Sequence, residues 1–348
     1  MKATILHAPR DIRVEEVPDP SIVAPTDALV RVTAACVCGS DLWPYRGINE
    51  VKEPTRIGHE FVGIVEEIGT EVSTVRPGDF VIAPFMYSDN TCPHCLAGIQ
   101  SACSTGGFWG GQDRDGVMVD GGQGEYARVP LADGTLVATP EVPSDDLVPS
   151  LLTLSDVMGT GWHAAVAAGV EKGDTVVVVG DGAVGLCGVL AAAQLGACRI
   201  VAMSRHESRQ KIAAQFGATD IVEARGDDAV SAVKDVTDGV GADAVLECVG
   251  TGEAMTTAIQ STRPGATVGY VGVPHGVELP VRSMFSRNVG VAGGIAPVRA
   301  YLPMLRDLVL AGDIDPGVVF DLQVPLTDAA EAYAAMDERR TIKSLIRT

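Results

Sequence analysis

The pattern of hydrophobic and polar positions changes near residue 150. Before that point, apolar residues occur in short β-type runs, for example ALVRVTAACV (28–37), FVGIVEEIG (61–69), GDFVIAPF (78–85) and GEYARVP (124–130). Segments such as RPGD (76–79) and ADGT (132–135) separate the runs and are typical of turns. This pattern predicts an all-β barrel or sandwich.

Beyond residue 150, apolar strands alternate with helix-like segments. The stretch DTVVVVGDGAVGLCGVLAAAQLG (174–196) predicts a buried strand, a glycine turn and a helix of small residues. Further apolar strands are expected at 199–204, 242–250 and 266–273, with helix-like segments such as 207–217 between them. The alternation predicts a doubly wound parallel sheet.

The remaining segment, from about residue 297, predicts two helices. They cover 298–312 and 326–340, and Thr327 is a candidate N-cap for the second. The chain has 348 residues, which is more than a single small core accommodates, so we expect two domains.

Composition and charge narrow the class of protein. The chain is 46% hydrophobic and 20% charged, as expected of a globular protein. Its formal net charge of −19 repels phosphate backbones, so a nucleic acid partner is not expected. No apolar run reaches the ~20 residues that span a bilayer, and the first residues contain no apolar signal core, so we expect a cytoplasmic protein with no membrane partner. The eight cysteines are then expected to be reduced, and clustered ones to bind metal.

A glycine motif stands between the strand and the helix predicted at 174–196. Gly180, Gly182 and Gly185 form G-x-G-x-x-G. Gly180 permits a tight turn, Gly182 lets the backbone approach a pyrophosphate, and Gly185 lets helix and strand pack closely. The alternative is an ordinary strand-turn-helix without a ligand. The spacing and the context favour a dinucleotide site.

The end of the second strand indicates which dinucleotide binds. An NAD site has Asp or Glu there, whereas this chain has Ser204, followed by Arg205, His206 and Arg209. A hydroxyl and guanidinium groups bind a 2′-phosphate, which an acid would repel. We therefore predict a preference for NADP(H) over NAD(H). The alternative is that the arginines are solvated surface residues and NAD binds.

Metal chemistry is suggested by ACVCGSD (35–41) together with GHE (58–60). Cys38 and His59 supply a thiolate and an imidazole, and a catalytic zinc needs about three protein ligands. Asp41 is expected to orient His59 through its other ring nitrogen, or else to form a turn. Cys36 is expected to be a buried apolar thiol.

These elements resemble one family. GHEFVGIVEEIG (58–69), VRPGDFVIAPF (75–85), the cysteine-rich segment 88–103 and GDGAVG (180–185) are similar to the zinc-dependent medium-chain alcohol dehydrogenases, in order and spacing, over essentially the whole chain. The resemblance implies an α/β protein with a GroES-like β-barrel catalytic domain (1–155 and 297–348) and a Rossmann cofactor domain (156–296).

The resemblance also implies the remaining parts of a catalytic zinc site. LSDVMGTGWHA (154–164) matches a family motif in which Asp156 is the third zinc ligand and Thr160 lies against the nicotinamide. A Cys-His-Asp set resembles the bacterial NADP-dependent secondary-alcohol branch. Glu60 matches a residue behind the zinc. Ser40 matches the hydroxyl that takes the substrate proton, whereas Trp43 replaces the His of the usual relay.

Further site residues follow from the same resemblance. Ala183, Val184, Val271 and Val273 match positions that line the cofactor. Two aromatic residues, Phe85 and Trp109, match positions that line the substrate pocket, although both could be plain core aromatics. An apolar, aromatic pocket suits a ketone or a hydrophobic aldehyde better than a polyol.

The cysteine-rich segment resembles the structural-zinc lobe of the family. Cys92, Cys95 and Cys103 match three of its four ligands, and Asp89 stands in the place of the fourth. A carboxylate also binds zinc, so we expect a filled site. His94 is a rival fourth ligand, and an empty lobe held by packing is the other alternative.

We therefore predict a zinc-dependent dehydrogenase that transfers a hydride reversibly between NADP(H) and an alcohol, ketone or aldehyde, most specifically a secondary alcohol. An NAD-dependent polyol, sugar or threonine dehydrogenase and a non-catalytic NADP-binding protein are the alternatives. The run NVGVAGGIA (288–296) resembles the strand through which cofactor domains pair, so a homodimer or homotetramer is expected.

Overall fold

The computed structural model describes residues 1–51 and 53–348. It divides into two compact units, each with its own sheet. The first unit comprises Met1–Asp156 and Pro297–Thr348, and the second comprises Val157–Ala296. The first unit therefore contains two segments of the chain that are far apart in sequence.

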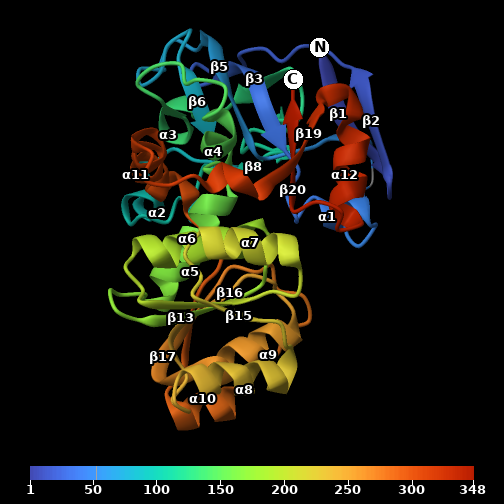
Figure 1. Ribbon diagram of the computed structural model, residues 1–348. Coiled ribbons are helices and arrows are strands. Elements are labelled where there is room, and N and C mark those ends of the chain that lie inside the picture. The colour runs from blue at the N-terminus through green and yellow to red at the C-terminus, as the bar shows by residue number, and fades with distance from the viewer. Residues whose placement is uncertain (52) are drawn as a thin grey trace. The chain divides into compact units, whose positions relative to one another are not determined.

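The largest sheet of the first unit is built around β3 (Ala28–Cys36). This strand pairs antiparallel with β5 (Phe61–Ile68) along one side, and with β11 (Tyr126–Val129) and β20 (Lys343–Arg347) along the other. Figure 1 shows β20, in red, beside β3, in blue. The whole sheet has seven strands in the order β12-β6-β5-β3-β20-β19, with β11 also paired to β3.

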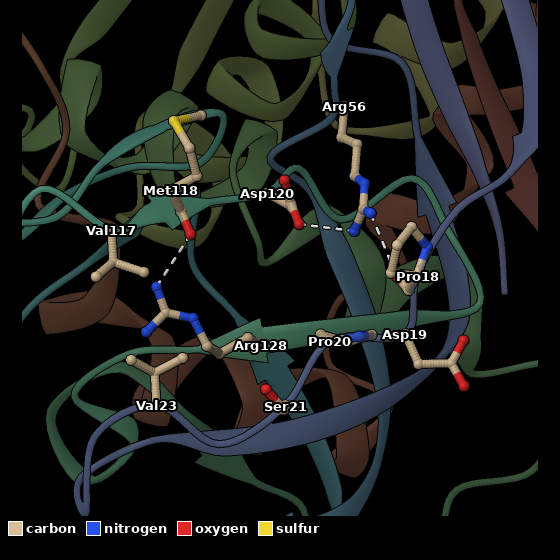
Figure 2. Close-up of a pocket in the computed structure, with 10 residues that line it drawn as sticks. All are labelled: Pro18, Asp19, Pro20, Ser21, Val23, Arg56, Val117, Met118, Asp120 and Arg128. Atoms are coloured by element: carbon tan, nitrogen blue, oxygen red, sulfur yellow. Dashed lines mark hydrogen bonds and ion pairs between the residues drawn. The ribbon is translucent and has the colours of Figure 1, made fainter.

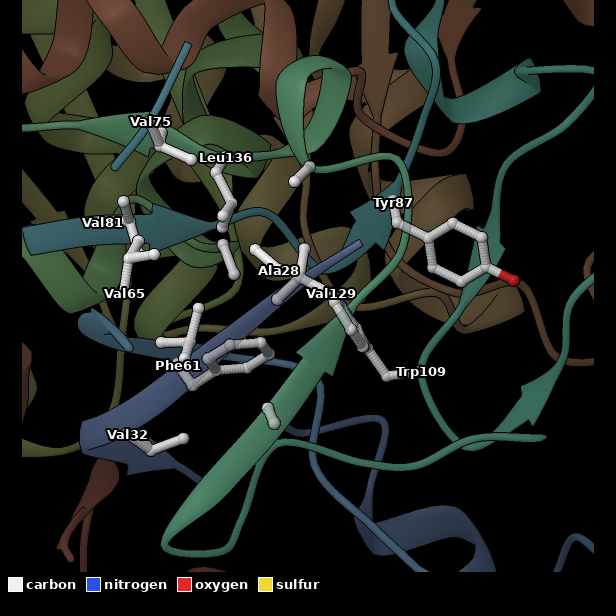
Figure 3. Close-up of a cluster of buried hydrophobic side chains, with 14 of the residues drawn as sticks. Ala28, Val32, Phe61, Val65, Val75, Val81, Tyr87, Trp109, Val129 and Leu136 are labelled. Carbon is white, nitrogen blue, oxygen red and sulfur yellow. The ribbon is translucent and has the colours of Figure 1, made fainter. Parts of the chain in front are cut away.

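The core of the first unit fills the inner face of this sheet. Buried β-branched and aromatic side chains alternate with more exposed positions along the strands, as a half-buried sheet requires. Figure 3 shows Phe61 of β5 beside Val32 of β3 and Val129 of β11. The edge of Trp109 meets Phe61 with 5.0 Å between the ring centroids. These contacts hold the strand ends that carry the candidate ligands.

The first unit contains many further elements, most of them short. The strands are β1 (Lys2–Ala8), β2 (Asp11–Glu16), β4 (Thr55–Arg56), β6 (Phe80–Ala83), β7 (Met86–Tyr87), β8 (Gly107–Phe108), β9 (Gly111–Gln112), β10 (Met118–Val119), β12 (Val137–Ala138) and β19 (Phe320–Pro325). The helices are α1 (Leu42–Tyr45), α2 (Pro93–Leu96), η1 (Gln100–Ala102), α3 (Ala132–Thr135), α4 (Val148–Thr153), α11 (Val298–Ala311), η2 (Pro316–Val319), η3 (Leu326–Asp328) and α12 (Ala329–Asp337).

Two local predictions in the first unit were wrong. The ADGT segment, expected as a turn, forms the single-turn helix α3 after Leu131, which has a left-handed backbone (φ 52°). The N-cap of α12 is Asp328 rather than Thr327, because a short 3-10 turn over Leu326–Asp328 precedes the helix. Both differences arise where a tight turn merges with a helix end.

The second unit is a doubly wound parallel sheet. Its six strands run in the order β15-β14-β13-β16-β17-β18, and all adjacent pairs are parallel. In Figure 1, α6 and α7 lie on one face of the sheet, and α8 and α9 lie on the other. The strand TVVVV is almost entirely buried because helices cover both faces.

The elements of the second unit alternate as the sequence predicts. The strands are β13 (Thr175–Val179), β14 (Arg199–Met203), β15 (Asp220–Val222), β16 (Ala242–Glu247), β17 (Thr262–Tyr270) and β18 (Gly290–Gly293). The helices are α5 (Val157–Ala168), α6 (Ala183–Gln194), α7 (Glu207–Gln215), α8 (Gly226–Val236), α9 (Gly252–Ser261) and α10 (Val281–Arg287). The strand order reverses between β13 and β16, and ligands of such sheets bind at the carboxyl ends of the strands near that point.

The helices of residues 1–51 and 53–348 are too short to cross a membrane. None of the helices there combines the length and the apolar character that crossing a bilayer requires. The longest, α11, has 14 residues.

Candidate active site and cofactor site

Four potential metal ligands converge in the first unit. Cys38 follows β3 by two residues, and His59 and Glu60 directly precede β5, the neighbour of β3. Asp156 comes from the segment after α4, where Ser155 Oγ donates a hydrogen bond to Phe61 O at 3.1 Å. One donor atom from each of the four residues lies within 4.8 Å of the others. Sheet pairing and one side-chain hydrogen bond therefore bring three chain segments to one point.

The distances between these donors suit a tetrahedral metal ion. Asp156 Oδ2 lies 3.4 Å from Cys38 Sγ and 3.5 Å from His59 Nε2. Ligand atoms about 2.1 Å from a zinc ion lie about 3.4 Å from one another in a tetrahedron. A thiol, an imidazole and a carboxylate at this spacing match the donor set of a catalytic zinc.

Asp41 fixes the orientation of the imidazole. Its Oδ1 lies 3.2 Å from His59 Nδ1, and its Oδ2 accepts the backbone N–H of Cys38 at 2.9 Å. His59 Nε2 is thereby directed to Asp156. Burial alone would lower the pKa of His59, but the charge of Asp41 and the hydrogen bonds with Asp156 and Asp41 outweigh it and raise that pKa well above its ordinary value.

A bound cation would stabilise the deprotonated form of the Cys38 thiol. Burial and the neighbouring Asp156 carboxylate raise the pKa of Cys38 to about 11. The protein alone therefore keeps this thiol protonated at neutral pH. A divalent cation at the same point stabilises the thiolate instead and inverts the effect of the surroundings.

A buried polar network lies behind the cluster. Lys343 Nζ donates to Glu60 Oε1 at 2.7 Å and to Val37 O at 3.1 Å, and the Cys36 thiol donates to Glu60 Oε2 at 3.1 Å. The side chains of Lys343 and Glu60 are 1% and 0% exposed. Burial raises the pKa of Glu60, although the Lys343 charge opposes it. Both oxygens of Glu60 are thus held by residues of β20 and β3.

Sequence analysis missed Lys343 because its partner is remote. The only signal was a lysine inside the apolar segment IKSLIR. Charged residues are almost never fully buried unless they are paired, so a lysine at that position called for an acidic partner. Which acid supplies it depends on the pairing of β20 with β3 and of β3 with β5.

Aromatic rings stand beside His59. The centroid of Phe85 lies 6.3 Å from that of the imidazole, and Phe85 stacks with Phe108 at 6.4 Å. Phe108 is 50% exposed, unusual for so large an apolar side chain, and it was not among the predicted site residues. The sequence signal for Phe108 was its position in GGFWGG, directly before Trp109, which was predicted to line the substrate pocket.

Trp109 itself belongs to the core cluster of the first unit. It is 7% exposed, and its Nε1 donates to Pro84 O at 3.0 Å. Figure 3 shows it among the buried side chains around Phe61 and Tyr87. This placement corresponds to the core alternative for Trp109. Ser40 lies in the turn between Cys38 and Asp41 and is half-buried.

A second set of donors forms the cysteine-rich lobe. Donor atoms of Asp89, Cys92, Cys95 and Cys103 lie within 4.8 Å of one another, and Cys92 Sγ and Cys103 Sγ are 3.9 Å apart. His94, on α2, is exposed and is not part of this set. Three thiols and one carboxylate make an acceptable tetrahedral zinc site.

Hydrogen bonds favour the ionised form of two donors of the lobe, Asp89 and Cys92, whereas burial raises the pKa of Cys95. Thr105 Oγ1 donates to Asp89 Oδ2 at 2.6 Å, and the Cys92 N–H donates to Asp89 Oδ1 at 2.9 Å. Burial alone would raise the pKa of Asp89, but these hydrogen bonds outweigh it and lower the pKa. Backbone N–H groups of Cys95 and Ser104 lower the pKa of Cys92 to about 6. All eight cysteines are free thiols, which a disulfide-based lobe would not allow.

The glycine motif of the second unit has the shape of a phosphate cradle. Gly180 follows β13 directly and has φ +116°, a conformation that favours glycine. A Cβ built on Gly182, the N-cap of α6, meets no atom of the described residues within 4 Å, so the backbone is open to a ligand there. A Cβ on Gly185 would lie 2.0 Å from Gly180 O, which only glycine avoids. The residues present therefore fit a dinucleotide.

The remaining predicted cofactor residues lie mostly at the carboxyl edge of this sheet. Ser204 follows β14 and is buried, Arg205 is exposed, and Val271 follows β17. Ala183 and Val184 open α6, and Val273 is exposed two residues beyond Val271. Thr160 is buried on α5 of the same unit. Arg209 lies in the first turn of α7.

Asp181, inside the glycine motif, was overlooked. Ser204 Oγ donates to Asp181 Oδ2 at 2.7 Å, and Arg209 Nη1 lies 3.3 Å from Asp181 Oδ1. Sequence analysis searched for an acid only at the end of the second strand. In the structure, the acid Asp181 reaches the end of β14 from the turn that follows β13.

A pocket of about 220 Å³ on the first unit involves none of these residues. Its lining consists of Pro18, Asp19, Pro20, Ser21, Val23, Arg56, Val117, Met118, Asp120 and Arg128 (Figure 2). Arg56 Nη1 donates to Asp120 at 2.7 Å, and Arg128 Nη1 donates to Asp27 at 3.0 Å. Both guanidinium groups are thus already paired with carboxylates, and we assign no ligand to the pocket.

Comparison with known proteins identifies the family. Residues 24–141 match the family model described as the alcohol dehydrogenase GroES-like domain, and residues 183–309 match that of zinc-binding dehydrogenases. A probable zinc-binding alcohol dehydrogenase of Mycobacterium tuberculosis is 35% identical over 342 residues, which cover 97% of this chain and 86% of the relative. The chain belongs to the zinc-dependent medium-chain alcohol dehydrogenases.

Two further relatives of this alcohol dehydrogenase bear on its fold and cofactor. The alcohol dehydrogenase from Thermus sp. ATN1 has a TM-score of 0.92 and 32% identity, covering 100% of this chain and 99% of that one. An NADP-dependent isopropanol dehydrogenase from Thermoanaerobacter brockii is 35% identical over 301 residues, which cover 84% of this chain and 83% of the relative. The predicted fold class, a GroES-like domain with a Rossmann domain, is confirmed. Membership of this dehydrogenase family implies zinc and a nicotinamide cofactor.

Proposed function

We propose that the dehydrogenase interconverts apolar secondary alcohols and ketones, or aldehydes, with NADP(H) as the preferred cofactor. The observation that carries the proposal is the convergence of Cys38, His59 and Asp156 beside the half-buried ring of Phe85, which stacks on the exposed Phe108. The zinc, when bound, acts as a Lewis acid on an alcohol or carbonyl oxygen, and the nicotinamide accepts or donates the hydride.

Within this proposal, each residue of the cluster has one task. Cys38, His59 and Asp156 hold the catalytic zinc, and Asp41 keeps the imidazole oriented. Glu60 balances charge behind the ion, because its carboxylate is anchored to Lys343. Ser40 takes the substrate proton. Trp43 cannot pass it on as a histidine would, so water or a cofactor hydroxyl completes the path.

The aromatic residues near His59 support an apolar substrate. Phe85 and Phe108 offer ring faces and edges but no hydrogen-bond partner for a polyol. Trp109, the chain neighbour of Phe108, packs in the core against Phe61. The name of the Thermoanaerobacter brockii relative, an isopropanol dehydrogenase, agrees with a small secondary alcohol.

We assign the dinucleotide to the carboxyl edge of the second unit. The pyrophosphate lies on the glycine motif and the first turn of α6, where Ala183 and Val184 contribute backbone N–H groups. Val271, Val273 and Thr160 flank the nicotinamide half. Arg205 and Arg209 favour a 2′-phosphate, and the same relative is named as NADP-dependent.

Two further features complete the proposal. Asp89, Cys92, Cys95 and Cys103 hold a structural zinc. β18 is the outer strand of its sheet, and Phe285 on the preceding α10 is 84% exposed. A strand whose outer edge is open, beside exposed apolar residues, favours association of two copies into a homodimer, or of four into a homotetramer.

The test is a turnover assay of the purified protein on a panel of ketones, aldehydes, secondary alcohols, sorbitol, glucose and threonine. Each substrate is paired with both cofactors, before and after removal of zinc by a chelator and after its return. We expect ketone reduction with NADPH to have the highest kcat/KM and to disappear reversibly with the metal. Faster turnover of a polyol or threonine with NAD would select the alternative dehydrogenases, and nucleotide binding without any turnover would select a binding protein.

A further inference from the structure

The carboxylate of Asp181 lies next to the position at which dinucleotide-binding proteins distinguish NAD from NADP. Asp181 stands between Gly180 and Gly182, in the turn that follows β13, and β13 pairs with β14. Ser204 directly follows β14, at the position where NAD-binding proteins carry an acid. The 2.7 Å hydrogen bond from Ser204 Oγ to Asp181 Oδ2 places a carboxylate at that position, although it comes from another strand.

This contact changes what Ser204 can offer. A hydroxyl has one hydrogen and two acceptor sites, and the hydrogen of Ser204 is donated to Asp181. The side chain is also 0% exposed as part of a buried residue. Ser204 therefore has no hydrogen left for the oxygen of a 2′-phosphate, which only accepts.

Asp181 also compensates the charge of Arg209. Its Nη1 lies 3.3 Å from Asp181 Oδ1 and donates to Asp181 O at 3.2 Å. A second acid, Glu223, accepts from Gln210 Nε2 at 3.0 Å, and the same amide donates to Ser204 O. Arg205 is exposed and makes no hydrogen bond or ion pair within the described chain. The charge of Arg205 is therefore available to a 2′-phosphate.

We propose that Asp181 is the residue that limits selectivity for NADP(H) over NAD(H). The inference rests on the proposed dinucleotide site. Asp181 acts by supplying a negative charge next to the 2′ position and by engaging Ser204 and Arg209. Arg205 acts in the opposite direction, because no carboxylate compensates its charge.

The experiment measures dissociation constants by fluorescence titration of NADPH and NADH with the wild-type protein and with Asp181→Asn. The amide keeps an oxygen that accepts from Ser204 but removes the charge. We expect the ratio Kd(NADH)/Kd(NADPH) to rise by at least about tenfold, as loss of one like charge near a phosphate predicts. Binding of 2′,5′-ADP, which lacks the nicotinamide, should strengthen by the same factor.

Asp220→Asn is the matched control. It removes the same charge from the same unit, but at the first residue of β15, where the opposite edge of the parallel sheet begins. The ratio should stay within about twofold of wild type, because the Asp220 carboxylate pairs with Arg199 and contacts neither Ser204 nor Arg209 within the described chain. Arg205→Ala, an exposed change that leaves the fold intact, should weaken NADPH at least about tenfold and NADH little.

The outcomes separate the two proposals. If the wild-type protein binds neither dinucleotide, the proposed cofactor site fails and this inference fails with it. If the wild type binds both but Asp181→Asn leaves the ratio unchanged or lowers it, the inference alone is overturned. A lowered ratio would mean that the carboxylate holds Arg209 in place for the phosphate. An unselective effect of Arg205→Ala would also overturn the inference.

Discussion

Asp41 positions two of the potential ligands of the candidate zinc site. It contacts the ring nitrogen of His59 that points away from Asp156, and it also accepts the backbone N–H of the ligand Cys38. One carboxylate therefore positions two ligands. Such supporting carboxylates fix the tautomer of a histidine and make it a stronger ligand.

Replacing Asp41 with alanine removes both contacts while leaving all four donors present. We expect kcat/KM to fall by about 10- to 100-fold and zinc to be lost faster to a chelator, because supporting residues contribute that much. Asp41→Asn, which retains an acceptor, should lose less. The control is Asp145→Ala, since the side chain of Asp145 is 84% exposed and pairs only with Arg347. Unchanged zinc release in Asp41→Ala would contradict the positioning role.

Single residues also mark the limit of prediction from sequence. Cys38, His59 and Asp156 could be named because motif spacing and family resemblance point to them. Phe108 and Asp181 were missed because their positions follow from contacts that no spacing reveals. Phe108 stacks on Phe85, and Asp181 meets a side chain from the next strand.

At the scale of elements, three strands enclose the buried network behind the ligands. Cys36 ends β3, Glu60 precedes β5 and Lys343 begins β20. The pairing β5-β3-β20 aligns these three ends. The strands themselves could be predicted from alternating apolar residues. Their order could not, because β20 comes from a distant part of the chain and its place beside β3 depends on long-range pairing.

Lys343→Met tests this arrangement, because it leaves the carboxylate of Glu60 buried without its cation. We expect the free energy of unfolding, measured in urea, to fall by about 3–5 kcal/mol. Adding Glu60→Gln should recover part of the loss. Arg31→Met breaks the exposed pair with Glu66 and should cost at most about 1 kcal/mol. Equal urea midpoints for the two single variants would show that the buried pair adds no stability.

At the scale of the whole molecule, the two donor sets and the glycine motif were all visible in the sequence, and the family assignment accounts for the fold around them. The identity of the fourth lobe ligand was less certain, since Asp89 and His94 are both close in sequence to the cysteines. We propose Asp89, because it accepts N–H groups inside the lobe, whereas His94 is exposed on α2.

Zinc content of the whole protein tests that assignment. We expect two zinc ions per chain in the wild type and one in Cys103→Ser, with a lower thermal midpoint because the lobe loses a ligand. Ketone reduction should persist at low temperature, since the Cys38 set is unchanged. His94→Ala should retain both ions. A single zinc in the wild-type protein, or loss of one in His94→Ala, would contradict the Asp89 assignment.

The place of β20 in the first unit has a consequence for biosynthesis. Lys343 leaves the ribosome after every residue of the second unit, so a nascent chain can fold that unit before the first sheet is complete. At about 5–20 residues per second, the stretch between Asp156 and Lys343 takes on the order of 10–40 seconds to make. During that interval Glu60 lacks its cation, and metal captured early would meet an unfinished pocket. Completion of the catalytic centre therefore waits for the synthesis of β20.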